Sequence, residues 1–370
     1  MSDFIPVAAP ALIGNEKKYV MDCLDSSWIS SNGKYIELFE KGFADFLGVK
    51  YAISCCNGTA ALHLALLALG VGQDDEVIVP SLTYVSSANA VMYCGAKPVF
   101  VDSEDQTWNL NPDLIEASIT DRTRGIIVVH LYGHPVDMDP VLAIARKHDI
   151  FVIEDSAEAH GAEYKGRKVG TMGDIATFSF YGNKIISTGE GGMVCTQNDD
   201  LAARVRQLKG QGQDPKRRFW FPMLGYNYRM TNIEAAIGLG QLEKIDWHMT
   251  RRREVASWYR AGLSEFPQVD FSPEMPWARS VFWLSCIVLK DGIDRDMVMN
   301  SMLQKGVETR PFFYPMHILP IYQSSTYGKQ FPVADRLARQ GLNLPSSALL
   351  TQPQVDFVIN TLKQAVRRLV

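Results

Sequence analysis

The sequence lacks the features that define several large classes of protein. Its 370 residues contain no apolar run of the roughly 18 residues that a membrane-spanning helix requires. Residues 1–6 do not show the charged-then-apolar pattern of a signal peptide. Lysine and arginine total 37 against 41 acidic residues, a net charge of −4, so there is no basic footprint for nucleic acid. We therefore expect a cytoplasmic protein with no membrane span and no nucleic-acid partner.

Cysteine is scarce, and its positions exclude a common kind of metal site. The six cysteines are scattered and never show the C-x2-C spacing of a zinc site. Cys55 and Cys195 lie in apolar, strand-like runs, where free cysteine is usually buried and reduced. His130 and His134 have no recognisable set of partner ligands, so we interpret them as core or cleft-rim residues. No metal is expected.

Between residues 51 and 196 the sequence contains an alternation of short apolar runs and helical segments. Seven segments are predicted as strands: 51–55, 76–79, 98–102, 125–130, 151–154, 175–180 and 193–196. Helices are predicted at 60–69, 81–93, 113–118 and 140–148. Strands with interleaved helices are typical of a mostly parallel sheet that is covered on both faces. The last two strands are close in sequence and could run antiparallel.

The pattern changes after residue 200. Helices are predicted at 201–209, 232–245, 249–263, 295–305 and 352–369, and a strand at 282–289. Two further helices, at 14–24 and 35–47, precede the first strand. The chain is long enough for two domains. We expect a large domain over residues 1–245, which holds the seven-stranded sheet, and a smaller C-terminal α+β domain over residues 246–370.

One lysine lies on a glycine-rich connection between two of the predicted strands. Lys184 follows strand 175–180, and Gly189, Gly191 and Gly192 precede the apolar run 193–196. Glycine permits a close backbone turn, so Lys184 is expected on a tight connection. Two interpretations are open from this stretch alone. The lysine could be solvated on a hairpin, or it could point into a cleft, where its amine can form a Schiff base with a carbonyl compound.

The strand predicted at 151–154 ends in acidic residues. Ligands in open α/β sheets bind at the carboxyl ends of the strands, which places Asp155 at the rim of the crevice. Asp155 could instead cap a helix or form a salt bridge. A pyridoxal phosphate site needs both a lysine and a carboxylate, because the carboxylate keeps the ring nitrogen protonated. The presence of Lys184 therefore favours the functional interpretation of Asp155.

Other residues could hold the remaining parts of such a cofactor. The turn 56–60 lies between a strand and a helix, and backbone N–H groups at a helix N-terminus bind phosphate. Thr59 and Ser179 could add hydroxyl groups. Tyr84 could lie over a flat heterocycle or be a packing aromatic. The segment 225–232 could reach a ligand or merely cap a helix.

Several ordered motifs together resemble the sugar aminotransferases of the DegT/DnrJ/EryC1/StrS family. The matching stretches are 57–62 (NGTAAL), 98–102 (PVFVD), 130–135 (HLYGHP), 154–155 (ED), 188–192 (TGEGG) and 225–230 (GYNYRM). They extend over nearly the whole chain. The resemblance implies the fold-type-I architecture of aspartate aminotransferase, an α/β fold with a mostly parallel seven-stranded sheet, and pyridoxal 5′-phosphate (PLP) as the cofactor.

The resemblance also implies roles for individual residues. Lys184 would bind the cofactor aldehyde, Asp155 would pair with the pyridine nitrogen, and Tyr84 would stack on the ring. The phosphate would be held by small and polar residues, namely Gly58, Thr59, Ala60, Ser179 and, from a neighbouring subunit, Asn227. The protein would then be at least a homodimer, or a tetramer, with active sites at the subunit interface.

One departure from the family pattern bears on the substrate. Many relatives have glutamine where this chain has Glu158, which we expect near the cofactor. Glu158 with His160 resembles the branch that transfers an amino group from L-glutamate to the 4-keto carbon of GDP-4-keto-6-deoxymannose. Lys184 argues against a related dehydratase branch, which has histidine there. The alternatives are a UDP- or dTDP-linked keto sugar as acceptor, or a regulatory relative that binds PLP without catalysis.

The nucleotide-sugar pocket is less clearly marked in the sequence. The candidates to line it are Trp28, His160, Arg310, Tyr314 and His317. Arg217 and Arg218 could face the diphosphate, because guanidinium pairs well with phosphate oxygens, or they could belong to a solvated basic loop. In the reaction Lys184 would act as a base, which requires burial or a neighbouring charge to favour its neutral amine.

Overall fold

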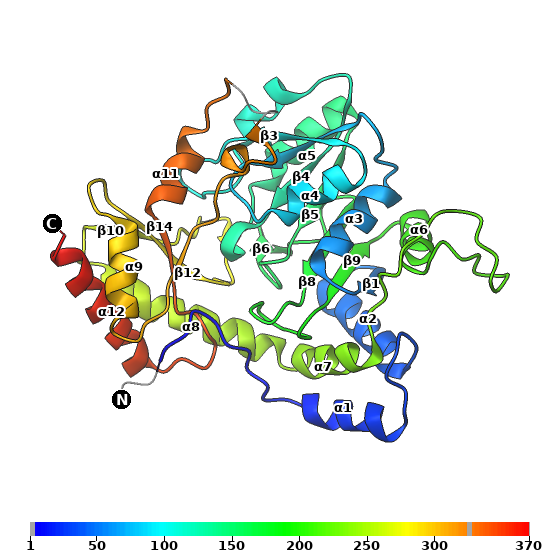
Figure 1. Cartoon of the computed structure of the whole chain (residues 1–370), viewed down its shortest axis with the longest axis horizontal. Coiled ribbons are helices and arrows are strands. Elements are labelled where there is room, and N and C mark those ends of the chain that lie inside the picture. The colour runs from blue at the N-terminus through cyan, green and yellow to red at the C-terminus, as the bar shows by residue number, and fades with distance from the viewer. Residues whose placement is uncertain (1–3, 324–327, 370) are drawn as a thin grey trace.

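The computed structural model describes residues 4–323 and 328–369 (Figure 1). Residues 1–3, part of the stretch assessed for a signal pattern, lie outside the described residues, as do 324–327 and 370 of the predicted second domain. The strands form a seven-stranded, a four-stranded and a three-stranded sheet. Within the described ranges, no helix is both long enough and apolar enough to cross a membrane.

The seven-stranded sheet confirms the predicted architecture. Its order is β1-β9-β8-β5-β4-β2-β3. The strands are β1 (Tyr51–Cys55), β2 (Glu76–Pro80), β3 (Lys97–Val101), β4 (Thr123–Val129), β5 (Phe151–Asp155), β8 (Ile175–Ser179) and β9 (Gly192–Thr196). Strand β9 runs antiparallel to both of its neighbours, and the other pairings are parallel. The carboxyl ends of β5 and β8 therefore lie at the same edge.

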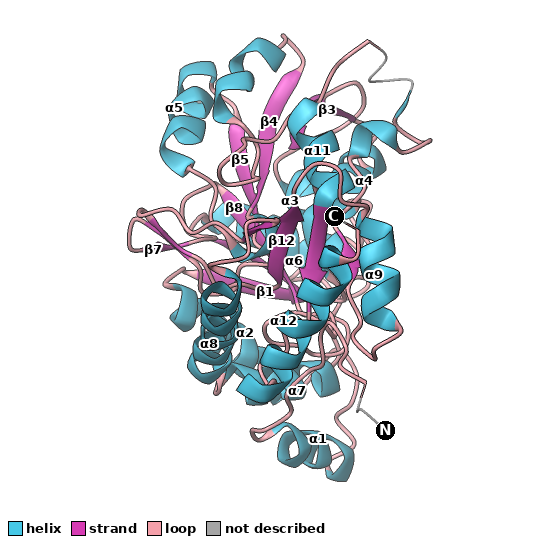
Figure 2. Cartoon of the chain, turned by 90° about the vertical axis from the view of Figure 1, so that its left-hand side faces the viewer, coloured by secondary structure: helices cyan, strands magenta, loops and turns pink. Residues whose placement is uncertain are grey.

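Helices cover both faces of this sheet, because neighbouring residues of each strand point to opposite sides. Val77 and Val79 pack in a cluster with α3 (Gly58–Ala68), α4 (Ser86–Tyr93) and α6 (Asp199–Lys209). Ile78 packs instead in a cluster with α5 (Met138–His148). Figure 2 places α5 on one side of β4 and β5, and α4 on the other. At the β1 end, α2 (Lys34–Leu47) and α7 (Asn232–Leu242) cover the sheet, and α1 (Glu16–Asp25) packs on α7.

The C-terminal part builds a second, antiparallel sheet. Its order is β10-β12-β14-β13, with β10 (Val269–Phe271), β12 (Ser285–Leu289), β14 (Gly341–Leu344) and β13 (Arg310–Pro311). The helices of this part are α8 (Ile245–Leu263), α9 (Arg295–Leu303), α11 (Pro332–Gln340) and α12 (Gln352–Arg367). One apolar cluster contains both Val79 of the first sheet and Val288 of the second. The division at residue 245 therefore stays a prediction.

Some predicted elements are wrong in their limits. The helix predicted at 81–93 begins only at Ser86, because Ser81 still pairs with Val101 beyond the end of β2. The helix predicted at 113–118 is two short 3-10 turns, Pro112–Leu114 and Glu116–Ser118. The strand predicted from residue 282 begins at Ser285, since Phe282 has a left-handed φ of 46°. Arg217 and Arg218 lie on a loop, as one of the two interpretations of these residues proposed.

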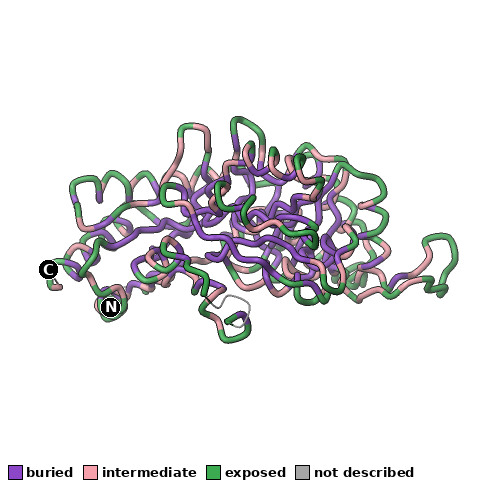
Figure 3. The backbone as a smooth tube through the Cα atoms, turned by 90° about the horizontal axis from the view of Figure 1, so that it is seen from above, coloured by how far each residue is buried: buried purple, intermediate pink, exposed green. Residues whose placement is uncertain are grey.

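A third, small sheet links the two halves of the chain. It has the order β11-β6-β7 and contains β6 (Glu163–Tyr164), β7 (Arg167–Lys168) and β11 (Ala278–Arg279). A loop over residues 211–225, here called the arm, projects from the body after α6 (Figures 1 and 3). The arm exposes large apolar side chains, Phe219, Trp220, Phe221 and Leu224. Figure 3 shows the buried backbone running through the centre of the molecule, with the arm outside it.

Candidate active site

Lys184 lies on the connection between β8 and β9, at the edge where the parallel strands end. Its Nζ is 3.7 Å from Oε1 of Glu158 and 4.0 Å from the centroid of the Trp283 ring. The side chain is only 12% exposed, so this lysine is enclosed and not solvated. Burial lowers the pKa of Lys184, although the carboxylates of Glu158 and Asp155 oppose that shift. A neutral amine is therefore more accessible here than on a free lysine.

Two buried carboxyl groups lie beside this lysine. Asp155 ends β5, and its carboxylate accepts hydrogen bonds from the Ser87 hydroxyl (2.8 Å) and the Ala157 N–H (3.2 Å). Burial raises the pKa of Asp155, while these hydrogen bonds and the Lys184 ammonium oppose the rise. Glu158 accepts from the Tyr132 N–H at 2.8 Å, and burial raises its pKa to about 7. The site thus holds one amine and two carboxyl groups of different surroundings.

The residues predicted to hold a phosphate gather at the N-terminus of α3. A Cβ atom on Gly58 would lie 2.8 Å from Cβ of Ser179, so only glycine allows this close approach. The hydroxyl groups of Thr59 and Ser86 are 2.8 Å apart. The N–H of Ala60 donates to the side chain of Asn57 at 2.8 Å, so it already has a partner. Gly58, Thr59 and Ser179 therefore form a small polar cradle with the helix terminus.

A row of aromatic rings connects the predicted ring-stacking residue to Lys184. Tyr84 is exposed, and its ring centroid is 5.6 Å from that of Phe313. Phe313 stacks on Tyr132 at 5.4 Å, and Tyr132 stacks on Trp283 at 6.3 Å. Trp283 faces Nζ of Lys184. Only the two ends of this row had a role assigned from the sequence: Tyr132 lies in the 130–135 motif without an assigned role, and Phe313 and Trp283 come from segments without a motif.

Asn227 is presented outward by its neighbours. Tyr226 and Tyr228 stack on each other with ring centroids 5.1 Å apart, and both rings pack against His63. The carbonyl of Tyr228 accepts a hydrogen bond from the N–H of Cys56, which ties this segment to the polar cradle at the N-terminus of α3. Asn227 itself is exposed and accepts a hydrogen bond from the Arg229 guanidinium at 3.4 Å. Asn227 therefore lies on the surface of the described chain, on a segment that contacts the start of α3.

The predicted substrate residues come from separate segments of the chain and differ in burial. His160 is fully buried among Phe43, Phe178 and Phe180, and burial lowers its pKa to about 3. Its position therefore does not support contact with a substrate. Trp28 is exposed on a loop, and its main-chain carbonyl accepts a hydrogen bond from the side-chain amide of Asn232 at 2.7 Å.

The other candidates lie on the C-terminal segment and on the arm. Arg310 pairs with Glu308 at 3.2 Å, and Tyr314 is exposed. His317 contacts the Ser81 hydroxyl (2.7 Å) and Asp335 (3.0 Å). Arg217 and Arg218 lie over the rings of Trp220 and Phe219, respectively. Arg217 and Arg218 thus belong to the exposed arm.

A buried carboxylate that the sequence did not single out organises the loop behind the site. Glu154 accepts hydrogen bonds from the N–H groups of Gly170 (2.7 Å), Met172 (2.6 Å) and Gly173 (2.7 Å). Its other contact is Nε2 of His130 at 3.2 Å, and His130 is completely buried. Glu154 precedes Asp155 on β5, so it faces the opposite side of the sheet. It fixes the strand that carries Asp155.

The fold and the lysine–carboxylate site define an enzyme of the fold-type-I aminotransferase class. The chain belongs to the DegT/DnrJ/EryC1/StrS aminotransferase family, whose sequence profile matches residues 10–363. It is 53% identical to GDP-perosamine synthase of Caulobacter vibrioides, covering 99% of this chain and 100% of that protein.

Two further comparisons agree with this family. GDP-perosamine synthase of Escherichia coli O157:H7 is 49% identical over 98% of each chain. A Streptococcus pneumoniae protein solved in a PLP form superposes with a TM-score of 0.94 at 27% identity, over 99% of this chain and all of that chain. The similarity thus includes the whole architecture and is not confined to one motif.

Proposed function

We propose that this protein is a PLP-dependent transaminase that moves the amino group of L-glutamate to the 4-keto carbon of GDP-4-keto-6-deoxymannose, forming GDP-perosamine. The observation that carries the transaminase assignment is the enclosed amine of Lys184 beside Asp155 and Glu158. The sugar assignment is supported by the two relatives named GDP-perosamine synthase, which match this chain over nearly its full length.

The residues present fit the cofactor. The close approach of Gly58 and Ser179 brings the Ser179 hydroxyl to the N-terminus of α3, where the helix dipole favours the charge of a phosphate. Asp155 supplies a buried carboxylate for the ring nitrogen, and Lys184 supplies an amine for the aldehyde. When bound, this cofactor supplies an electron sink for the carbon that loses its proton.

The side chains of the site would then share the proton transfers. Lys184 Nζ would take the proton from the donor's Cα and return it on the acceptor side, which its lowered pKa favours. Asp155 would hold a proton on the ring nitrogen. Glu158, with a pKa near 7 and 3.7 Å away, would compensate the charge of the lysine as it changes. The aromatic row from Tyr84 to Trp283 would restrict water on one side.

A second copy of the chain is part of the proposal. The exposed Asn227 would complete the phosphate cradle of its partner, as the family resemblance implies. The arm exposes four large apolar side chains, and clustered exposed apolar side chains mark interaction sites. A two-fold contact would build two equal sites.

The test of this function is a substrate panel. The purified protein with PLP is incubated with L-glutamate and GDP-, UDP- or dTDP-linked 4-keto-6-deoxy sugars, and the amino product is scored by mass. We expect a yellow protein whose colour glutamate bleaches, with product only from the GDP-linked sugar. Product from a UDP- or dTDP-linked sugar instead would overturn the sugar assignment, and a spectrum unchanged by glutamate would overturn the transaminase.

The pKa of Glu158 leads to a pH-dependent prediction for Glu158→Gln. Because burial raises this pKa from 4.5 to about 7, the folded protein binds more protons than the unfolded chain between these values. Wild-type stability therefore falls as the pH rises from about 4.5 to about 7, by on the order of 3 kcal/mol from this group. Glu158→Gln should remove that part of the fall.

The measurement is urea unfolding of cofactor-free protein at about pH 5 and about pH 7.5. The matched control is Glu163→Gln, which removes a carboxylate paired with Arg279 on the small outer sheet. In the control, the free energy of unfolding should differ between the two pH values as much as it does in the wild-type protein. If the unfolding free energy of Glu158→Gln changed between the two pH values as much as that of the wild type, the raised pKa of Glu158 would be contradicted.

A further inference from the structure

Arg252 on α8 is a buried cation without an acidic partner. It is 3% exposed, and in residues 4–323 and 328–369 it forms no ion pair. Its guanidinium instead donates to three carbonyl oxygens: those of Trp283 (2.7 Å), Ser346 (3.1 Å) and Lys184 (3.1 Å). Burying a charge without a counter-ion is costly, so these contacts require an explanation beyond stability.

Trp283 contacts the same stretch of main chain, at Asn183 and Lys184. Its indole N–H donates to the carbonyl of Asn183 at 2.8 Å, while its ring faces Nζ of Lys184. Two consecutive carbonyls, of Asn183 and Lys184, are therefore held by Trp283 and Arg252, respectively. Arg252 also holds the carbonyl of Trp283 itself. The main chain and the amine of Lys184 are thus fixed by one pair of residues, here called the Arg252–Trp283 bracket.

The bracket ties Lys184 to the second sheet. Trp283 precedes β12, and Ser346 follows β14, whereas Lys184 belongs to the edge of the first sheet. Helix α8, which carries Arg252, starts beside α7 and extends to the C-terminal helices (Figure 1). The position of the amine is therefore set by elements far away in the sequence.

The bracket also acts on the charge of the lysine. The guanidinium cation disfavours a second cation nearby, and it contributes to the lowered pKa of Lys184, after burial. Glu158 and Asp155 act in the opposite direction. Burial lowers the pKa of Arg252 itself to about 10, which leaves it charged at neutral pH.

We propose that Arg252 and Trp283 are positioning residues that aim the amine of Lys184 at the reacting carbon. This inference rests on the proposed transaminase function, because only a reacting amine needs to be held in a defined position. Small misplacements of a reacting group cost up to about a hundredfold in rate. Loosening the bracket should therefore lower kcat more than it changes KM.

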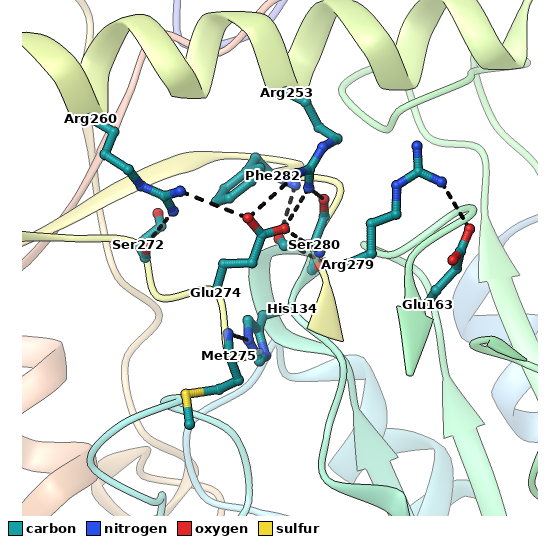
Figure 4. Close-up of polar contacts among 11 residues, drawn as sticks. His134, Glu163, Arg253, Arg260, Ser272, Glu274, Met275, Arg279, Ser280 and Phe282 are labelled. Atoms are coloured by element: carbon teal, nitrogen blue, oxygen red, sulfur yellow. Dashed lines mark hydrogen bonds and ion pairs between the residues drawn. The ribbon is translucent and has the colours of Figure 1, made fainter. Parts of the chain in front are cut away.

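The test compares Arg252→Lys with Arg253→Gln, a change at the next residue of α8. Lysine keeps the charge but has a single nitrogen in place of the planar guanidinium, whose Nη1 and Nη2 atoms reach separate carbonyls. Arg253 lies on the other side, where it contacts Glu274 and the carbonyl of Ser280 (Figure 4). For Arg252→Lys we expect kcat to fall about tenfold with KM for glutamate within about twofold. Arg253→Gln should leave both constants near wild type.

A second readout does not depend on activity. In cofactor-free protein, hydrogen–deuterium exchange of peptides covering residues 181–188 should speed up in Arg252→Lys and stay unchanged in Arg253→Gln. Trp283→Phe keeps a ring over the lysine and removes the N–H donor, so it should speed up exchange as well. If Arg252→Lys fails to fold, Trp283→Phe decides the test.

The proposal is overturned if exchange and kcat in Arg252→Lys, or in Trp283→Phe where it must decide, match those of Arg253→Gln. The charge effect is read from Arg252→Met, in which the pH midpoint of the cofactor's visible absorbance should rise. Failure of the proposed function gives a different result: the wild-type protein itself would show no glutamate-dependent change in colour, whatever the exchange rates of the variants.

Discussion

Lys184→Ala should abolish transamination, with a loss of turnover on the order of 10⁴-fold. The variant removes the enclosed amine, and the neighbouring carboxyl groups cannot replace it, because Glu158 and Asp155 are acids held by other hydrogen bonds. The measurement is the rate of product formation from glutamate and the keto sugar, together with the visible spectrum of the protein after addition of PLP. We expect the visible band of a lysine-linked cofactor to be missing.

A surface lysine provides the control. Lys165→Ala removes a lysine that pairs with Asp139 at 2.5 Å on the outer sheet, and it should behave as wild type in both measurements. Exogenous methylamine should partly restore turnover to Lys184→Ala, because it returns an amine to the space left by the side chain. Turnover in Lys184→Ala at the wild-type level would disprove the catalytic role of this residue.

Asp155→Asn should have the second largest effect, a loss of kcat of about 10²- to 10³-fold. Asparagine has nearly the same shape, and its amide oxygen can still accept from the Ser87 hydroxyl. It carries no negative charge, so it cannot hold a proton on a ring nitrogen. The colour of the PLP-loaded protein should persist, since Lys184 is intact, while bleaching by glutamate becomes slow.

Ser87→Ala is a milder change at the same carboxylate. It removes a hydrogen bond that lowers the pKa of Asp155, so it should raise that pKa and weaken catalysis only several-fold. The order of activity should therefore be wild type, Ser87→Ala, Asp155→Asn. Equal rates in wild type and Asp155→Asn, measured in single turnovers with glutamate, would exclude the proposed role of the carboxylate.

The sheet and the position of Asp155 could be predicted because they depend on local pattern and on a general rule of topology. Each strand is a short apolar run, and the carboxyl ends of parallel strands meet at one edge. Asp155 ends such a run and was therefore expected at that edge, whereas for Lys184, which follows another run, the pattern alone left a solvated hairpin and a cleft position both open. The antiparallel direction of β9 was also indicated by the short connection.

The walls of the site could not be predicted in the same way. Tyr132 adopts a left-handed φ of 53°, and Phe282, just before Trp283, has a φ of 46°, conformations for which the sequence gives no clear signal. Arg252 is on a helix with several other arginines, and nothing in its pattern distinguishes it from Arg253. The burial of His160 among phenylalanine rings could not be predicted, because a motif carries residue identity without showing which side chains face the core.

The return of the chain through β9 has a consequence for how this enzyme can vary. The segment that bears the lysine is anchored at both ends in adjacent strands, so an added or deleted residue would have to be accommodated between two fixed ends. Replacing side chains around that segment disturbs only contacts. Acceptor preference in such a framework can change by substitution at nearly constant spacing, while the amine keeps its place.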